Sequence, residues 1–336
     1  MTKDKIDIVY LWVDGSDEKW RKEKDKYLEK ITGKIKIYKG VADEARFRDN
    51  GEFLHSLRSV SKYAPWVNHI YIITGFNQKP KWLNTKHPKI TIVSHESIMP
   101  KEALPTFNAT AIEMCIPNIK NLSEKFILMN DDIFFNKPVK PSFFFDKHGR
   151  AKVLFNSHRK HPKDVSKWLP MLDGYTKTLV NSAKILEDNF GKKLYFGRPS
   201  HGIDPYLKSS WIECLNNPNI KKQVNKQINN KFRTDDEIQR WTFNLYDLIM
   251  GRAIFSHTRA RKYGKHCISN FIYNLLHWNK IRKSNIVCTN AVLAKKAILK
   301  SPIFCLNDSH DNSPEILRGN AQFLEERFPD KCEFEK

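Results

Sequence analysis

The sequence has no long apolar run, no paired-cysteine motif and no signal peptide. A membrane-spanning helix needs about 18 or more consecutive apolar residues, and the 336-residue chain contains no such run. Its six cysteines are scattered without a CxxC pair, so zinc ligation and a disulfide framework are both poorly supported. The opening residues run from lysines into a short strand-like segment that ends in acids. We therefore expect a cytoplasmic protein with reduced thiols.

Several catalytic signatures are also missing. No GxxxxGK[ST], GxGxxG, HExxH or GxSxG motif occurs, and P-loop hydrolysis, Rossmann dinucleotide binding, zincin chemistry and α/β-hydrolase chemistry lose most of their support. Disorder of the whole chain is excluded, because hydrophobic residues make up 40% and aromatic residues 12% of it. The length allows one large α/β domain or two smaller ones.

Acidic residues are absent from residues 248–307, whereas eleven Lys or Arg lie there. The whole chain carries a formal net charge of +21, and such one-sign stretches favour an anionic partner. Nucleic acid, anionic lipid and a phosphate-bearing substrate all fit, as does a lysine-rich proteome without a specific partner. We expect peripheral docking on the anionic inner face of the cytoplasmic membrane, helped by the apolar segment Phe271–Trp278. Binding of a polyanionic product is the competing use of this stretch.

Four short apolar runs read as buried strands, each ending near a polar residue or glycine. They are Ile6–Val13, His69–Gly75, Lys89–His95 and Lys125–Asp131. Helical spacing of apolar residues predicts helices over Gly51–Tyr63 and Ala109–Ile119. Alternating strands and helices indicate an α/β fold with a mostly parallel, Rossmann-like sheet and helices on both faces. Ligands of such sheets bind beyond the carboxyl ends of the strands.

The second half of the chain has a looser pattern. We predict a strand over Lys152–Asn156, then helices, a final strand and a closing helix; these last elements are Val165–Phe190, Pro205–Asn216, Asp235–Met250, Ile303–Leu306 and Pro314–Phe328. No linker or internal repeat is apparent. We expect one catalytic domain with an α/β core over 1–150, a helical, basic insertion over 151–300 and a closing strand and helix over 301–336.

Polar residues follow two of the predicted strands. Asp14, Gly15 and Asp17 come after the first strand, where they suit either a nucleotide site or an ordinary Asp-Gly turn. The fourth strand ends in Asn130, Asp131 and Asp132. Two adjacent carboxylates at the end of a buried strand either hold a cation such as Mg²⁺, accept a proton, or cap a turn. Their position favours a functional role.

Three further places hold candidate site residues. They are suggested by where they lie relative to the predicted helices and strands, and not by a motif. His201 precedes a predicted helix and can exchange a proton with a sugar hydroxyl. Arg233 lies at the predicted start of another helix and suits bidentate phosphate binding. Asn307 and Asp308 follow the last predicted strand. A lone His or Arg is more often structural, so none of these residues decides the function by itself.

Taken together, these segments resemble the Stealth family of bacterial capsular polysaccharide phosphotransferases. The catalytic part of the animal enzyme that transfers N-acetylglucosamine 1-phosphate to lysosomal glycoproteins is similar as well. Four blocks carry the resemblance in the order of the family: Ile6–Asp17 (IDIVYLWVDGSD), Arg46–Phe135 (RFRDNGEF through FILMNDDIFF), His201–Ile254 (HGIDPYLKSSW through LIMGRAI) and Cys305–Pro329 (CLNDSHDNSPEIL onward).

The resemblance implies a glycosyltransferase-A-like sheet and transfer of an N-acetylhexosamine 1-phosphate from a UDP-sugar to a polysaccharide hydroxyl, with UMP released and Mg²⁺ expected. It assigns Asp131 and Asp132 as base or metal ligands, Arg233 to phosphate stabilisation and His201 to proton transfer or phosphate binding. The remaining substrate-binding positions are Asp14, Gly15, Asp17, Arg48, Asn50, Asn130, Asn307 and Asp308.

Two other functions remain open at the level of sequence. An ordinary glycosyltransferase would release UDP instead of UMP. A non-enzymatic nucleic-acid binder is favoured by the net charge, but the basic stretch has no recognised nucleic-acid motif and the acids Asp131 and Asp132 would repel a phosphate backbone. We therefore expect no nucleic-acid partner.

Overall fold

A computed structural model describes most of the chain. The described residues are 5–31, 40–154, 159–160, 171–192, 195–196, 199, 202–256, 261–263 and 286–336. The predicted catalytic His201 and the apolar segment Phe271–Trp278 lie outside these ranges. Within them, no helix is both long and apolar enough to cross a membrane.

The core is a five-stranded sheet with the order β3-β2-β1-β4-β9. Its strands are β1 (Ile6–Leu11), β2 (Ile70–Thr74), β3 (Ile90–Ser94), β4 (Lys125–Asn130) and β9 (Asp204–Leu207). All neighbours pair in parallel except β9, which runs antiparallel to β4. The prediction of an α/β fold with a mostly parallel sheet is confirmed, and the first four strands lie where the apolar runs placed them.

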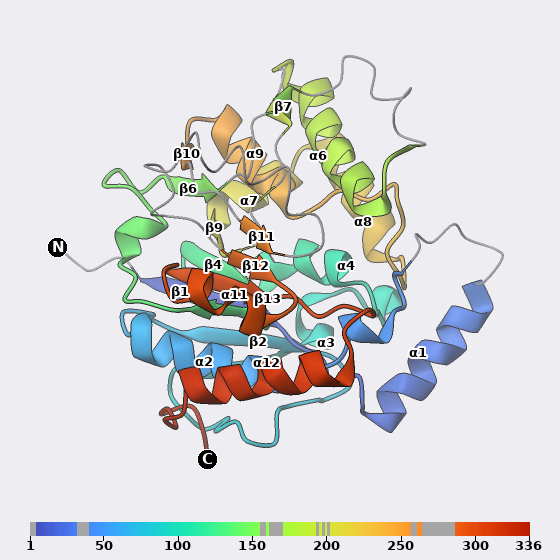
Figure 1. The fold of residues 1–336 in the computed structure, drawn as a ribbon. Coiled ribbons are helices and arrows are strands. Elements are labelled where there is room, and N and C mark those ends of the chain that lie inside the picture. The colour runs from blue at the N-terminus through green and yellow to red at the C-terminus, as the bar shows by residue number, and fades with distance from the viewer. Residues whose placement is uncertain are drawn as a thin grey trace.

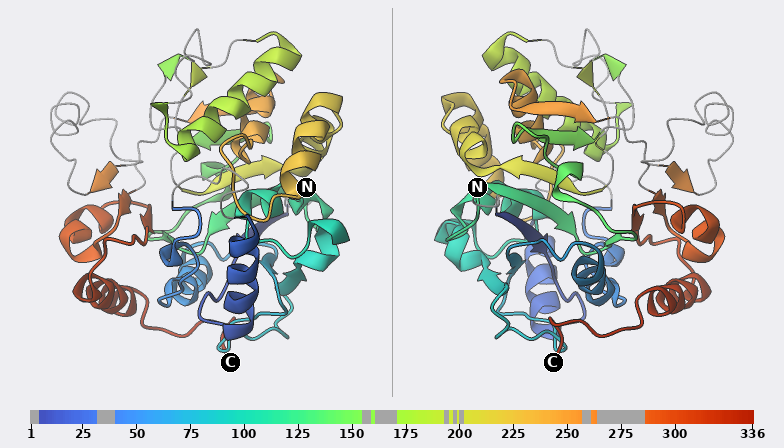
Figure 2. Two further views of the ribbon diagram at one scale, coloured as in Figure 1. Left: turned by 90° about the vertical axis from the view of Figure 1, so that its right-hand side faces the viewer. Right: turned by 90° about the vertical axis from the view of Figure 1, so that its left-hand side faces the viewer.

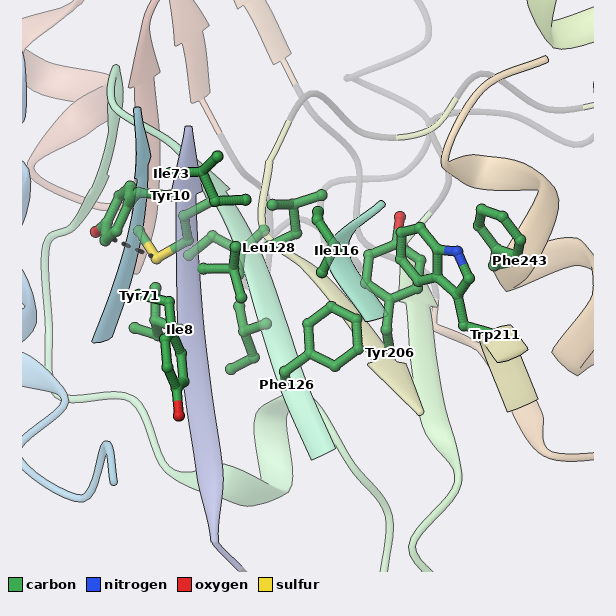
Figure 3. Close-up of a cluster of buried hydrophobic side chains, with 14 of the residues drawn as sticks. Ile8, Tyr10, Tyr71, Ile73, Ile116, Phe126, Leu128, Tyr206, Trp211 and Phe243 are labelled. Atoms are coloured by element: carbon green, nitrogen blue, oxygen red, sulfur yellow. Dashed lines mark hydrogen bonds between the residues drawn. The ribbon is translucent and has the colours of Figure 1, made fainter. Parts of the chain in front are cut away.

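Apolar side chains cover the strands of this sheet. Every residue of β2 is buried, as are the four central residues of β4. Figure 3 shows the cluster around β1 and β4, where Ile8 and Leu128 are fully buried and Phe126 stacks on Tyr206 of β9 with ring centroids 5.5 Å apart. Burial of such side chains stabilises the sheet by roughly 1.5–3 kcal/mol each, so the sheet forms a rigid base for the polar residues at its edge.

A second sheet, of order β11-β12-β13-β5, joins the middle of the chain to its C-terminal part. It consists of β11 (Arg261–Tyr263), β12 (Ile286–Cys288), β13 (Ile303–Leu306) and β5 (Ile133–Phe135). Because β5 follows β4 after two residues and pairs antiparallel with β13, the last predicted strand lies beside the Asp131–Asp132 pair. Two smaller pairs join β6 (Ala151–Leu154) to β10 (Ala253–Ser256) and β7 (Arg159–Lys160) to β8 (Tyr195–Phe196).

Helices pack around these sheets. Figure 1 shows α2 and α12 side by side below the central sheet, and both figures show α6, α8 and α9 gathered above it (Figures 1 and 2). The helices are α1 (Glu18–Ile31), α2 (Glu52–Tyr63), α3 (His95–Ile98), α4 (Ala109–Met114), α6 (Gly174–Phe190), α7 (Lys208–Leu215), α8 (Pro218–Ile228), α9 (Trp241–Ile249), α11 (Ala291–Ile298) and α12 (Pro314–Arg327).

Three predicted helices begin later than the sequence indicated. Residues 165–170 of the predicted helix Val165–Phe190 lie outside the described residues. The described helix begins at Gly174, where Asp173 caps it by accepting a hydrogen bond from the Thr176 amide. The first residues of the predicted helix Pro205–Asn216 instead pair with β4 as β9. The predicted helix from Asp235 begins at Trp241. Strand pairing with β4 overrides local helical spacing in the second case. In the third case the Ile238 and Gln239 amides donate to the side chains of Gln227 and Ser182, which holds the preceding residues in a non-helical loop.

Candidate active site

A cavity of about 450 Å³ opens at the carboxyl ends of the parallel strands. Trp12 and Val13 follow β1, Gly75 follows β2, and His95 follows β3 at its edge. Asn130, the last residue of β4, lines the same cavity. The polar residues predicted at the ends of the fourth and last strands therefore lie together at this edge of the sheet.

The described wall of the cavity holds more acidic than basic residues, whereas the whole chain has a large excess of basic residues. It contains seven acidic residues and four arginines, and the described lining includes no lysine. The acids are Asp43, Glu52, Glu113, Asp131, Asp132, Asp204 and Asp308, and the arginines are Arg46, Arg48, Arg233 and Arg240. Since arginine presents a planar fork of donors, it suits phosphate and carboxylate groups better than lysine does.

Carboxylates crowd the floor of the cavity around the Asp131–Asp132 pair. Burial, reinforced by the charge of Asp132, raises the pKa of Asp131 well above its ordinary value, and Asp49 and Glu52 add to this shift. Burial likewise raises the pKa of Glu52. The Cys305 thiol of β13 donates to Asp132 Oδ2 at 3.2 Å. This crowding stores electrostatic repulsion that a cation or a proton would relieve.

Asp308 links the last strand to the loop that precedes α2. Arg48 Nε donates to Asp308 Oδ2 at 2.8 Å, and Arg48 Nη2 lies 2.8 Å from the same oxygen. Asn50 Nδ2 donates to this oxygen at 3.3 Å and to Glu52 Oε1 at 3.0 Å. Asn307 Nδ2 donates to the backbone oxygen of Asp308. Arg48, Asn307 and Asp308 line the cavity, and Asn50 supports Glu52 beside them.

The residues after β1 have local partners. Asp14 Oδ1 accepts hydrogen bonds from the amide and hydroxyl of Ser16, and Asp17 Oδ1 accepts from the Trp20 amide at the start of α1. Gly15 donates its amide to the Phe47 carbonyl, and a Cβ on Gly15 would lie 2.4 Å from that oxygen. The structure therefore places these residues in a turn and a helix cap that hold the 46–48 loop against the cavity, with none of their side chains in its wall.

Arg233 lies in the cavity wall, but on a loop and not on a helix as predicted. The loop is held by Glu237, whose Oε1 accepts hydrogen bonds from Asn108 and Asn230. Phe232 stacks on Phe107 with ring centroids 5.3 Å apart. Burial raises the pKa of Glu237 to about 7, against the opposing effect of the Arg233 charge. Arg233 thus reaches the cavity from a well-anchored segment.

Sequence reasoning missed Arg240 and its two acidic partners. Arg240 Nη1 lies 2.5 Å from Glu113 Oε1 of α4, and Nε donates to Asp204 Oδ2 of β9 at 3.2 Å. Nη1 also donates to Asn130 Oδ1 at 3.3 Å. Burial raises the pKa of Asp204 to about 6, although Arg240 opposes the shift. Glu113 lies inside a helix and Arg240 directly before one, so no local motif marked either residue.

His95 is another residue of the wall that the sequence did not single out. Burial lowers the pKa of this imidazole to about 4, and it is neutral at pH 7. It lies at the start of α3, directly after β3, where its side chain provides a polar but uncharged part of the wall. A neutral imidazole donates one hydrogen bond from its protonated ring nitrogen and accepts one at the other.

The donor set suits a divalent cation only in part. Within the described ranges, no three or more His, Cys, Asp or Glu side chains gather in a group that would hold a metal by themselves. Mg²⁺, however, is typically bound by one or two carboxylates together with phosphate oxygens and water. Asp131 and Asp132 fit that pattern because they are adjacent, face the cavity and lie among like charges.

Comparisons with known proteins point in one direction. Residues 4–32 match conserved region 1 of the Stealth proteins, and residues 46–153 match conserved region 2. The chain is 32% identical to capsular polysaccharide phosphotransferase WcwK of Streptococcus pneumoniae over 99% of its own length and 98% of the relative. It is 30% identical to exopolysaccharide phosphotransferase cps2G of Lactiplantibacillus plantarum, covering 98% and 96% of the two chains.

Among solved structures, the galactosyltransferase LgtC is similar with a TM-score of 0.45 and 9% identity, over 96% of this chain and 95% of the other.

Proposed function

The chain belongs to the Stealth family, whose similar members are capsular and exopolysaccharide phosphotransferases, and from this premise we propose that it transfers N-acetylhexosamine 1-phosphate from a UDP-sugar to a sugar hydroxyl of a growing capsular or surface polysaccharide. The cavity supports the proposal because arginines and paired carboxylates meet at the carboxyl end of β4. Phosphoryl transfer depends mainly on positioning and charge stabilisation, and these residue types supply both.

The reaction breaks one phosphoanhydride bond. The acceptor hydroxyl oxygen attacks the phosphorus next to the sugar, and the bond from that phosphorus to the bridging oxygen breaks. UMP leaves with the bonding electron pair, the hydroxyl proton passes to a base, and a phosphodiester forms. Because the anomeric C–O bond stays intact, the sugar keeps its configuration. The protein must therefore hold the diphosphate in line with the acceptor and stabilise charge on the non-bridging oxygens.

We propose that Arg233 provides part of this stabilisation. Its side chain lines the cavity from an anchored loop, and a guanidinium can bind two phosphate oxygens at once. Arg48 lines the same cavity but is already paired with Asp308, so its role in the proposal is to close the wall around the donor. The role of His201 in proton transfer remains a prediction.

The acidic floor supports a requirement for a divalent cation. A nucleotide diphosphate is negatively charged, and like charges at close range inside a protein repel strongly. Asp131 and Asp132 would hold Mg²⁺, which when bound neutralises charge on the diphosphate. Asp49 and Glu52, whose charges add to the crowding, would strengthen the attraction for the cation. This favours a ligand role over a base role for the pair.

We also propose that α11 and the two residues after it contact an anionic membrane surface. Leu293, Val292 and Leu299 are 82%, 58% and 47% exposed. Lys295, Lys296 and Lys300 are exposed beside them. Apolar side chains flanked by lysines suit shallow insertion between anionic headgroups. This described surface lies within the acid-free stretch that the sequence singled out.

The deciding experiment identifies the nucleotide that is released. The protein is incubated with Mg²⁺, a panel of UDP-N-acetylhexosamines and short polysaccharide acceptors, and the products are analysed by mass spectrometry. The proposal predicts UMP and a product heavier by a hexosamine phosphate. Release of UDP with a product lacking phosphorus would instead establish ordinary glycosyl transfer. The Arg233→Ala variant tests the role of this arginine in the same assay. Its turnover should fall on the order of 10²–10³-fold, because one charged stabiliser is lost.

A further inference from the structure

Arg240 connects three elements that are far apart in the chain. Its partners are Glu113 in α4, Asn130 at the end of β4 and Asp204 at the start of β9. The sequence separations from Arg240 are 127, 110 and 36 residues. Since β4 and β9 already pair in the sheet, the guanidinium chiefly connects α4 to this pair of strands and bridges three parts of the cavity wall.

The contacts are buried and charge-assisted. The side chains of Glu113 and Asp204 are 6% and 9% exposed, and that of Arg240 is 18% exposed. Hydrogen bonds between ionised groups are about twice as strong as neutral ones. The planar fork of arginine reaches all three partners at once, whereas the single ammonium of lysine cannot. The arrangement is consequently specific for arginine.

The partners of Arg240 occupy most of the donors of its guanidinium. Nε, Nη1 and Nη2 of Arg240 all lie within 3.3 Å of protein acceptors, which leaves little donor capacity for a phosphate. The contact with Asn130 acts on the residue directly before Asp131. Whatever holds the Asn130 side chain therefore fixes the end of β4 from which the paired carboxylates project.

We propose that Arg240 is a positioning residue that holds Asn130, and through it the Asp131–Asp132 pair, in the geometry required for phosphoryl transfer. The inference rests on the proposed function and adds a residue to its machinery. It predicts that loss of the arginine fork lowers kcat and changes donor binding little, since a displacement of about 1 Å at the reacting groups can cost roughly 100-fold in rate.

Arg252 provides a matched control. Its guanidinium also makes charge-assisted bonds, to Glu213 at 2.7 and 3.0 Å and to Ser210 at 3.0 Å. It lies between α9 and β10, outside the residues that line the cavity. A loss of arginine geometry at this position perturbs the same helical layer without touching the end of β4.

The test compares Arg240→Lys and Arg252→Lys in the full-length protein. Steady-state kcat, donor KM and the thermal midpoint are measured for each. We expect kcat to fall about 100-fold in Arg240→Lys with KM within about threefold, and to stay within about twofold in Arg252→Lys. A raised KM with unchanged kcat would make Arg240 a donor-binding residue and overturn the proposal. A lowered thermal midpoint with unchanged kcat would make it merely structural, with the same consequence.

A double-mutant cycle tests the route through Asn130. If Arg240 acts through this side chain, the double variant with Asn130→Ala and Arg240→Lys has a kcat no lower than that of the more damaging single variant. A double variant whose loss of transition-state free energy equals the sum of the two single losses would refute that route. Should Arg240→Lys fail to fold, Glu113→Gln weakens the same network at constant shape. The inference then requires kcat to fall about tenfold in this variant, and an unchanged kcat would refute it.

Failure of the proposed function is recognised separately. It appears in the parent protein as release of UDP in place of UMP, before any variant is compared. The kcat values of Arg240→Lys and Arg252→Lys can be compared whether the released nucleotide is UMP or UDP.

Discussion

The cavity and the surface of α11 differ in charge. They are close along the chain, because the last residues that line the cavity, Leu306–His310, follow α11 after a short turn and β13. The described cavity wall holds seven acids and four arginines. The α11 surface, from Val292 to Lys300, holds three lysines and no acid. In a chain with a net charge of +21, the place where chemistry is proposed is thus the more acidic of the two. Net charge alone would have pointed to the wrong region.

This difference separates two uses of charge. In the cavity, fixed carboxylates and arginine forks stand close together and act at short range on bound groups. On α11, exposed lysines, of which Lys295 also pairs with Glu326 of α12 at 3.4 Å, act over about a Debye length and respond to salt. We expect the charges of the cavity to govern turnover and the lysines of α11 to govern binding to the membrane surface. Changes in one region should therefore leave the property of the other almost intact.

The largest effect should come from the cavity floor. Asp131→Asn removes one carboxylate at constant shape, and we expect turnover to fall on the order of 10³-fold because charge placement dominates phosphoryl transfer. Mass spectrometry of UMP release measures it. Asp188→Asn, which breaks an exposed ion pair with Lys184 on α6, is the control and should keep parental turnover. Parental turnover in Asp131→Asn would remove this carboxylate from the mechanism.

A smaller effect is expected on α11. Changing Lys295, Lys296 and Lys300 together to Gln removes about 3 kcal/mol of attraction to anionic lipid, so binding to vesicles rich in phosphatidylglycerol should weaken roughly 100-fold. Flotation with increasing lipid measures it, while turnover on a soluble acceptor should stay within about twofold.

The matched control for α11 is the exposed set Lys221, Lys222 and Lys226 of α8, changed in the same way. This variant should keep its vesicle binding. Equal binding of the parent to neutral vesicles, or an equal loss in both triple variants, would contradict a specific electrostatic contact through α11.

The smallest effect concerns a buried carboxyl outside the cavity. Burial raises the pKa of Asp247 to about 7, against the hydrogen bond from Ser210. Between about pH 4 and pH 7 the folded state binds this proton more tightly than the unfolded state, so ionisation lowers stability as pH rises. Asp247→Asn should therefore gain stability relative to the parent on going from pH 5 to pH 8. Urea unfolding at both pH values measures the difference, and a gain at pH 5 only would give the wrong sign.

Much of the fold could be predicted because its signals are local. The strands β1 to β4 and β13 are short apolar runs that end in polar residues, and fully buried parallel strands have that pattern. Their carboxyl ends then indicated Asn130, Asp131, Asp132, Asn307 and Asp308, all of which line one cavity. The pattern predicts the edge of the sheet without requiring knowledge of the loops.

The remaining features depend on contacts between distant residues. Asp204 begins a strand only because its neighbours pair with β4, and the sequence after it reads as a helix. No local motif marks Arg240 or Glu113, because their position in the cavity wall depends on a contact between residues 127 positions apart in the sequence. Asp14 and Asp17 follow a strand as nucleotide-binding acids often do, yet their side chains accept hydrogen bonds from Ser16 and Trp20. Local sequence does not distinguish the two uses.

The bond between Arg48 and Asp308 also constrains when the protein can become active during its synthesis. These residues lie 260 positions apart, and at about 5–20 residues per second a ribosome needs roughly 13 to 50 seconds to add the intervening chain. Throughout that interval the wall around the paired carboxylates is incomplete. A nascent chain with a folded first sheet therefore has no closed cavity, and catalytic competence arrives as a late, single event of biosynthesis.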